Sequence, residues 1–153
     1  MLIALIVAAG AVAAVFVAGL LTDAQATSTS IWISAAILAW LLSGIFALFG
    51  LAVAQTFRSE SSVTIASAGL VLLAFLGNLF VPLSGAILDI ARLTPMYCYS
   101  GLAHWPQLQG KLIAADDETG SDPMWALILN FVAWSVIFGL IAVWAVRRGR
   151  RRQ

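Results

Sequence analysis

Charge is the scarcest feature of this 153-residue chain, because only 10% of its residues are Asp, Glu, Lys or Arg. Soluble domains carry about 25%, whereas 62% of this chain is hydrophobic. A chain of about 150 residues buries only about 68–70% of the surface that it exposes when unfolded. So much apolar side chain therefore cannot be hidden from water. The composition excludes a soluble globular domain, and it excludes disorder, which needs low hydrophobicity and high charge.

Residues that carry chemistry are equally scarce. The net charge is only +1, and the chain has one cysteine, Cys98, and one histidine, His104. A zinc site needs three or four ligands, a single cysteine makes no disulfide within the chain, and the sequence has no phosphate-binding loop of the form G-x-x-x-x-G-K-[ST]. We therefore expect no catalytic residue, no cofactor, no metal and no nucleic-acid partner, and we do not expect an enzyme.

Long runs without charge are what the sequence does contain. They cover Met1–Thr22, Ala24–Phe57, Ser61–Leu88 and Pro123–Val146. Each run can cross a hydrocarbon core of about 30 Å once, since a crossing helix needs about 20 residues. Continuous rather than alternating hydrophobicity indicates helices and not a barrel. We predict an all-α integral membrane protein, a single domain over 1–153, with spans near 2–21, 31–54, 63–82 and 124–146.

Arginines predict the orientation of these spans. The tail 147–153 follows the last span and contains Arg147, Arg148, Arg150, Arg151 and Arg152. Cytoplasmic ends carry such an excess, so both termini are expected in the cytoplasm of a cell (plasma) membrane protein. Arg58 lies in the expected inner loop, and Asp116, Asp117, Glu118 and Asp122 lie in the expected outer loop beside a lone Lys111. Attraction to anionic membrane lipid is a second role for the tail.

The first span allows two further interpretations. Gly10, Ala14 and Ala18 are four residues apart, which favours close helix packing or a subunit interface, although a span so rich in alanine has this spacing by chance. Ala24-Gln25-Ala26 is similar to a signal-peptidase site, but no Lys or Arg precedes the apolar run, as a signal peptide requires. We expect a retained span; cleavage would leave three.

Residues 83–109 are predicted to be a broken amphipathic segment before the last span. Asp89 and Arg92 are three residues apart and can pair on one helical face. Pro95 then ends that helix, because it disfavours helical geometry at Thr94. Tyr97, Tyr99 and Trp105 follow and are interface-seeking aromatics. The segment is expected to be re-entrant in the outer leaflet, or to be an amphipathic loop on the headgroups.

Polar side chains inside the spans are few. Asn78 and Asn130 are expected to form hydrogen bonds between neighbouring helices. Trp40 and Trp134 are expected to face lipid or to belong to the aromatic belt.

The region from about Ile31 to the C-terminus resembles the permeases of ABC-type 2 transporters. The resemblance consists of Gly77-Asn78-Leu79-Phe80-Val81-Pro82, then Ile90-Ala91, Pro95 and Tyr97, a further short helical stretch, the last span and a basic end. It is a resemblance of loose motifs in a characteristic order. It implies that Gly77, Asn78, Phe80, Pro82, Asp89, Arg92, Pro95 and Tyr97 form an outer gate.

The resemblance also implies a function. The chain would be the permease subunit, or part of one, of an ATP-driven exporter that moves amphipathic or apolar cargo such as drugs, lipids or glycans. Its partners would be a separate ATP-binding subunit and a second permease copy or complementary permease half. The family has six spans and this chain is similar to the last four, so the parts that dock on the ATPase lie outside the resemblance. The alternative is a small four-span structural or accessory membrane protein without transport activity.

Overall fold

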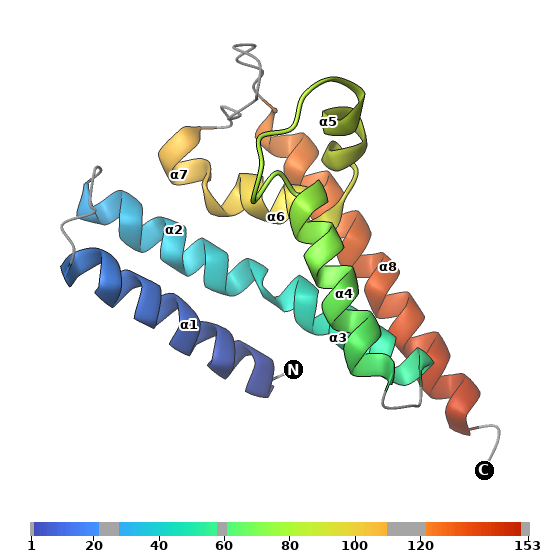
Figure 1. Cartoon of the computed structure of the whole chain (residues 1–153). Helices are drawn as coiled ribbons and strands as arrows, with labels where there is room; N and C mark the ends of the chain where they lie inside the picture. The colour runs from blue at the N-terminus through green and yellow to red at the C-terminus, as the bar shows by residue number, and fades with distance from the viewer. Residues whose placement is uncertain (1, 22–27, 58–60, 110–121, 151–153) are drawn as a thin grey trace.

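The computed structural model describes residues 2–21, 28–57, 61–109 and 122–150. Within these ranges the chain forms helices and no strands (Figure 1), so the all-α prediction is confirmed. The helices are α1 Leu2–Leu21, α2 Thr29–Leu42, α3 Gly44–Thr56, α4 Ser61–Leu76, α5 Gly85–Arg92, α6 Pro95–Ala103, α7 Trp105–Leu108 and α8 Met124–Arg150.

The longest helix, α8, organises the packing. It lies mainly against α3 and, nearer its N-terminus, against α6. Phe49 of α3 and Phe138 of α8 meet edge to face, with ring centroids 5.3 Å apart. Phe49 also approaches Gly69 of α4 so closely that a Cβ at Gly69 would lie 3.2 Å from the phenylalanine ring. An aromatic side chain thus fills the space between α3, α4 and α8.

A joint separates α2 from α3 inside the expected span 31–54. The Ser43 amide donates to the carbonyl oxygens of both Ala39 (3.1 Å) and Trp40 (3.3 Å). The Ser43 hydroxyl also donates to the Trp40 oxygen at 2.6 Å. Ser-Gly pairs are common sites of helix interruption, and Gly44 follows directly. Beyond the joint the main partners change, because α2 packs against α1, α6 and α7, whereas α3 packs mainly against α8 and α4 and less extensively against α1.

Helix α4 ends earlier than the span predicted over 63–82. Its last residue is Leu76, and Asn78 adopts a positive φ of 58°, which asparagine tolerates better than most residues. The Asn78 Oδ1 accepts a hydrogen bond from the Leu83 amide at 2.7 Å. This turn, followed by Pro82, removes 77–82 from the helix, so the predicted helical boundary at 82 is wrong.

The surface is unusually apolar. Most large hydrophobic side chains of α1, α4 and α8 are exposed, as illustrated by Ile3 (77%), Val63 (70%) and Leu140 (64%). Two described helices, Thr29–Thr56 with 28 residues and Met124–Arg148 with 25, are long and apolar enough to cross a membrane, as judged by length and composition. The apolar helices Leu5–Gly19 and Ser62–Leu76 are shorter.

The helices place the short segments at one end of the molecule. Figure 1 shows α5 and α6 beside the N-terminal half of α8 and α7 over the first half of α2, whereas α3 ends and α4 begins near the C-terminal half of α8. Several charged positions named above lie outside the described residues: Arg58, Lys111, Asp116, Asp117, Glu118, Arg151 and Arg152. The Ala24-Gln25-Ala26 sequence lies outside them as well.

Candidate functional site

The candidate site is the break between α5 and α6. Pro95 is the first residue of α6, and Thr94 is its N-cap, with extended backbone angles. The Thr94 hydroxyl accepts a hydrogen bond from the Tyr97 amide at 3.3 Å and donates one to the Ala91 carbonyl oxygen at 2.8 Å. It therefore joins the end of α5 to the start of α6. The break predicted at Pro95 is confirmed.

Side chains of α8 bind the carbonyl groups at this break. The Asn130 amide nitrogen donates to the Arg92 oxygen at 2.6 Å and to the Thr94 oxygen at 3.5 Å. The Trp134 indole nitrogen donates to the Leu93 oxygen at 2.7 Å. The last carbonyls of a helix have no partner within it, so α8 supplies the partners that α5 lacks. The interhelical hydrogen bond predicted for Asn130 is confirmed. Trp134, which was expected to face lipid or to belong to the aromatic belt, also forms a hydrogen bond to the break.

A charged cluster lies on the same break. Arg92 Nη1 lies 2.9 Å from Asp89 Oδ1, which confirms the predicted pair. Arg92 Nε lies 3.3 Å from Asp122 Oδ1 without hydrogen-bond geometry. The Tyr97 hydroxyl donates to Asp122 Oδ2. Asp122, two residues before α8, therefore contacts both α5, through Arg92, and α6, through Tyr97.

Tyr97 is buried at 3% exposure, not placed at an interface with water as its residue type suggests. Burial raises the pKa of its phenol, and the hydrogen bond to the Asp122 carboxylate raises it further. The phenol is therefore a hydrogen-bond donor at neutral pH and adds no charge. A neutral donor between an arginine and a carboxylate keeps the cluster compact without a second buried anion.

The other residues assigned to the outer gate separate into two groups. Gly77 is buried directly against Met96 of α6, because a Cβ at Gly77 would lie 2.7 Å from the Met96 Cβ. Asn78 closes the turn after α4, as described above. Phe80 and Pro82 are exposed, and Phe80 lies against Phe75 with ring centroids 5.0 Å apart. The structure therefore brings Gly77 to α6 and leaves Phe80 and Pro82 on the surface.

A small core lies beneath the break. It consists of Ala91, Tyr97, Cys98, Leu102 and Leu127, all of which are buried. The Cys98 thiol is fully buried and contacts the Pro95 oxygen at 3.1 Å. Burial raises its pKa to about 12, so the thiol is unreactive in the folded chain. Among the described residues no group of histidine, cysteine and carboxylate side chains could hold a metal.

Helix α6 also contacts the joint between α2 and α3. The Tyr99 hydroxyl donates to the Ala39 carbonyl oxygen at 3.3 Å, and the Tyr99 ring meets Phe46 edge to face, with centroids 5.0 Å apart. Ala39 lies just before the joint and Phe46 just after it. Helix α6 therefore contacts both sides of the joint.

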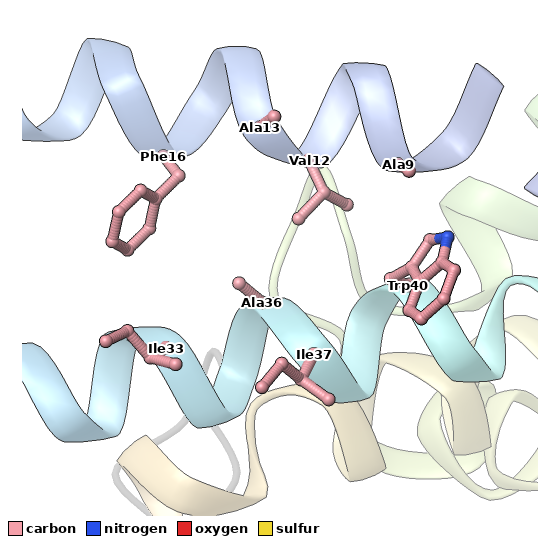
Figure 2. A pocket seen from close by; sticks show the side chains of 8 residues that line it. All are labelled: Ala9, Val12, Ala13, Phe16, Ile33, Ala36, Ile37 and Trp40. Carbon is pink, nitrogen blue, oxygen red and sulfur yellow. The ribbon is translucent and has the colours of Figure 1, made fainter. Parts of the chain in front are cut away.

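An open apolar groove runs between α1 and α2. Figure 2 shows its walls, with Phe16 and Val12 directed from α1 toward α2 and Trp40 directed from α2 toward α1. The Trp40 indole nitrogen donates to the Leu5 carbonyl oxygen at 2.9 Å, so this tryptophan binds a neighbouring helix. The volume is about 290 Å³. The groove is lined by Ala9, Val12, Ala13, Phe16, Ile33, Ala36, Ile37 and Trp40.

The stripe of small residues in α1 does not form this contact. Gly10, Ala14 and Ala18 are all exposed, and a Cβ at Gly10 would meet nothing within 4 Å. The close approach to α2 is made instead by Gly19, where a Cβ would lie 3.2 Å from the Trp32 ring. The stripe therefore does not form the contact between α1 and α2, and its role in a subunit interface stays a prediction.

At the other end of α8, Arg147 and Arg148 are exposed. The Arg148 guanidinium lies over the Trp144 ring, 5.2 Å from its centroid. Arg150 is the last residue of α8.

Sequence reasoning missed three members of the site: Asp122, Trp134 and the buried role of Tyr97. The signal for Trp134 was its indole N–H, which usually finds a partner when it is removed from water.

None of the protein-family models, curated proteins or solved structures compared with this chain matches it.

Proposed function

We propose that the chain is an integral membrane protein that crosses the bilayer four times. The exposed apolar faces of α1, α4 and α8 support this proposal, since soluble monomers rarely expose large contiguous apolar patches. Helix α1 has 20 residues, which is about 30 Å of helix. The four spans are α1, α2 with α3, α4 with the turn after it, and α8.

The proposed orientation places the C-terminal end of α8 in the cytoplasm of a cell membrane, together with the N-terminus. The arginines of the tail support this side by the positive-inside rule. The layer of α5, α6 and α7 then lies at the outer surface, with α5 re-entrant in the outer leaflet. Ile87, Ile90 and Leu93 are exposed on this layer, which suits contact with lipid.

We further propose that the chain is a permease subunit, or part of one, of an ATP-driven ABC exporter for amphipathic or apolar cargo. One observation carries this proposal: a broken helical layer stands between α4 and α8, and α8 binds the break through Asn130 and Trp134. The order of elements is the one that the ABC-type 2 resemblance implies. ATP would be hydrolysed by a separate subunit, and a second permease copy or half would complete the pathway.

The contacts at the break suggest how this chain would act. Because α8 holds the carbonyls of Arg92, Leu93 and Thr94, a displacement of α8 carries the end of α5 and the start of α6 with it. The Asp122 contacts to Arg92 and Tyr97 add a second attachment. The outer layer would therefore follow α8 when ATP binding moves the permease.

Co-purification tests the exporter proposal. The tagged chain, extracted from its native membrane in mild detergent, is expected to bring down an ATP-binding subunit in stoichiometric amount. A variant with Asn130→Leu and Trp134→Phe is expected to retain that subunit but to lose cargo export from membrane vesicles. If the chain never associates with an ATPase, even beside a partner that supplies two further spans, the exporter proposal is wrong. A structural or accessory role in the membrane is then left.

Cysteine accessibility tests the re-entrant layer separately. In a Cys98→Ser background, single cysteines at Leu93 and Asp89 are compared. Leu93 is 71% exposed and is expected to face lipid, so it reacts with membrane-soluble maleimides only. Asp89 is expected to face water and to react with charged reagents as well. Equal reaction of both positions with charged reagents would place the whole segment in water.

A further inference from the structure

A groove lies between α3 and α8 near the end of the chain. It is lined by Leu51, Ala142, Val143, Val146 and Arg147 and has a volume of about 310 Å³. Ala142 is buried, whereas Leu51 and Val143 are exposed. Four of the five lining residues are aliphatic, and the fifth is Arg147. The groove therefore combines an apolar lining with a single cation.

The two neighbouring arginines have different surroundings. Arg147 lines the groove, whereas the Arg148 guanidinium is stacked on Trp144 and is not among the lining residues. The cation–π contact gives Arg148 a partner of its own. The charge available to a ligand in the groove is thus that of Arg147.

We propose that this groove binds an anionic phospholipid, with an acyl chain along the aliphatic residues and the headgroup phosphate on Arg147. The charge complementarity carries the inference, because a guanidinium binds phosphate oxygens in a fixed fork geometry. The volume is at the lower end of the range of about 300–1,000 Å³ for small-molecule pockets. The inference rests on the membrane embedding proposed above, and it does not depend on the exporter role.

The location fits such a lipid. In the proposed orientation the groove lies in the cytoplasmic leaflet, which carries the anionic lipids. A zwitterionic lipid presents the same phosphate, but its headgroup also carries a cation, which the Arg147 guanidinium repels. The site is therefore expected to select lipids with a net negative headgroup.

Native mass spectrometry of the full chain tests the proposal. The protein is released from detergent micelles that contain phosphatidylglycerol and phosphatidylcholine in equal amounts. The wild-type chain is expected to retain one phosphatidylglycerol in preference to phosphatidylcholine. Arg147→Gln is expected to weaken that retention by about tenfold, since it removes a charge-assisted hydrogen-bonded contact to the phosphate of about 1.5 kcal/mol.

Arg148→Gln is the matched control, because it removes the same charge one residue away. It is expected to change retention by less than a factor of two. Equal losses for the two variants would overturn the proposal, since they would show a diffuse attraction to the tail. Failure of the wild-type chain to prefer phosphatidylglycerol would overturn it as well.

A second pair of variants tests the trough. Val143→Phe is expected to fill the groove and to reduce retention of both lipids. Val136→Phe, at another exposed position of α8, is expected to leave retention unchanged. Retention unaffected by Val143→Phe would exclude the acyl chain from the groove. Protection of Cys98 from maleimide verifies the fold of each variant. If the chain retains the lipid but never co-purifies with an ATP-binding subunit, the lipid inference stands and the exporter proposal alone is wrong.

Discussion

Gly77 is the position where one added methyl group has the clearest structural consequence. In Gly77→Ala the new Cβ would lie 2.7 Å from the Met96 Cβ, closer still to the Met96 Cγ, and 3.0 Å from the Leu73 carbonyl oxygen. Rotation of the Met96 side chain cannot relieve the contact with its own Cβ. Helix α6 is held in place by Thr94 and by Asn130 of α8, so the α4 end must move or α6 must tilt.

The cost follows from the behaviour of overpacked cores. Inserting a carbon into a well-packed site typically costs about 1–3 kcal/mol. For a chain of 150–250 residues, 1 kcal/mol lowers the melting temperature by about 2–4 °C. We therefore expect Gly77→Ala to lower the melting temperature by about 4–8 °C for a mid-range loss of 2 kcal/mol.

The chain carries its own reporter for this measurement. Cys98 is its single cysteine, lies two residues after Met96, and is fully buried. Its pKa of about 12 further suppresses reaction at neutral pH. A fluorogenic maleimide is therefore expected to react only after α6 leaves the core, so heating in detergent micelles yields a melting curve.

Gly50→Ala is the matched control, since a Cβ at Gly50 in α3 would meet nothing within 4 Å. It is expected to leave the melting temperature unchanged or to raise it, because alanine is the better helix former by about 1 kcal/mol. Gly77→Ala is expected to cost less in a Met96→Ala background than in the wild-type chain, because the contact with the Met96 Cγ is then absent. If Gly77→Ala and Gly50→Ala have the same melting temperature, α4 is not packed closely on α6.

Three further perturbations probe the contacts around the short helices. Asn130→Leu removes the side-chain donor to the carbonyl groups at the break and is expected to lower the free energy of unfolding by about 1 kcal/mol. The loss is seen as labelling of Cys98 at a lower temperature. Ser135→Ala is the control, because the Ser135 hydroxyl donates within its own helix, and it should change the free energy of unfolding by less than about 0.5 kcal/mol. The raised pKa of Tyr97 means that its neutral form stabilises the fold fully below its usual pKa near 10 and that this contribution is lost as pH rises above it. Tyr97→Phe should flatten that alkaline loss in near-UV circular dichroism above pH 10, and an unchanged slope there would contradict the assignment. Trp40→Phe loses the bond to α1 and should increase proteolysis after α1 without lowering the melting temperature of the rest of the fold.

Local features of the fold could be predicted because their causes are local. Pro95 sets the break, and the spacing of Asp89 and Arg92 sets their pairing, so both follow from a few adjacent residues. The length and continuous hydrophobicity of the uncharged runs likewise predict the long helices. The end of α4 could not be placed, because it depends on the Asn78 turn, and an asparagine in an apolar run carries no such signal.

The tertiary part of the candidate site could not be predicted. Tyr97 and Asp122 are 25 residues apart, and Trp134 and Leu93 are 41 apart, so nothing in their local sequence pairs them. Their residue types suggested other roles, an interfacial aromatic for Tyr97 and a charge of the outer loop for Asp122. Only the arrangement of α5, α6 and α8 brings these groups together.

The joint at Ser43 divides the long helical segment between two sets of packing partners. Helix α3 lies between α4 and α8, whereas α2 extends from the joint as an arm that contacts α1, α6 and α7. The Ala39 oxygen accepts from both the Ser43 amide and the Tyr99 hydroxyl. A swing of the arm therefore strains the same oxygen that anchors α6, and the angle of the arm and the position of the outer layer cannot change independently.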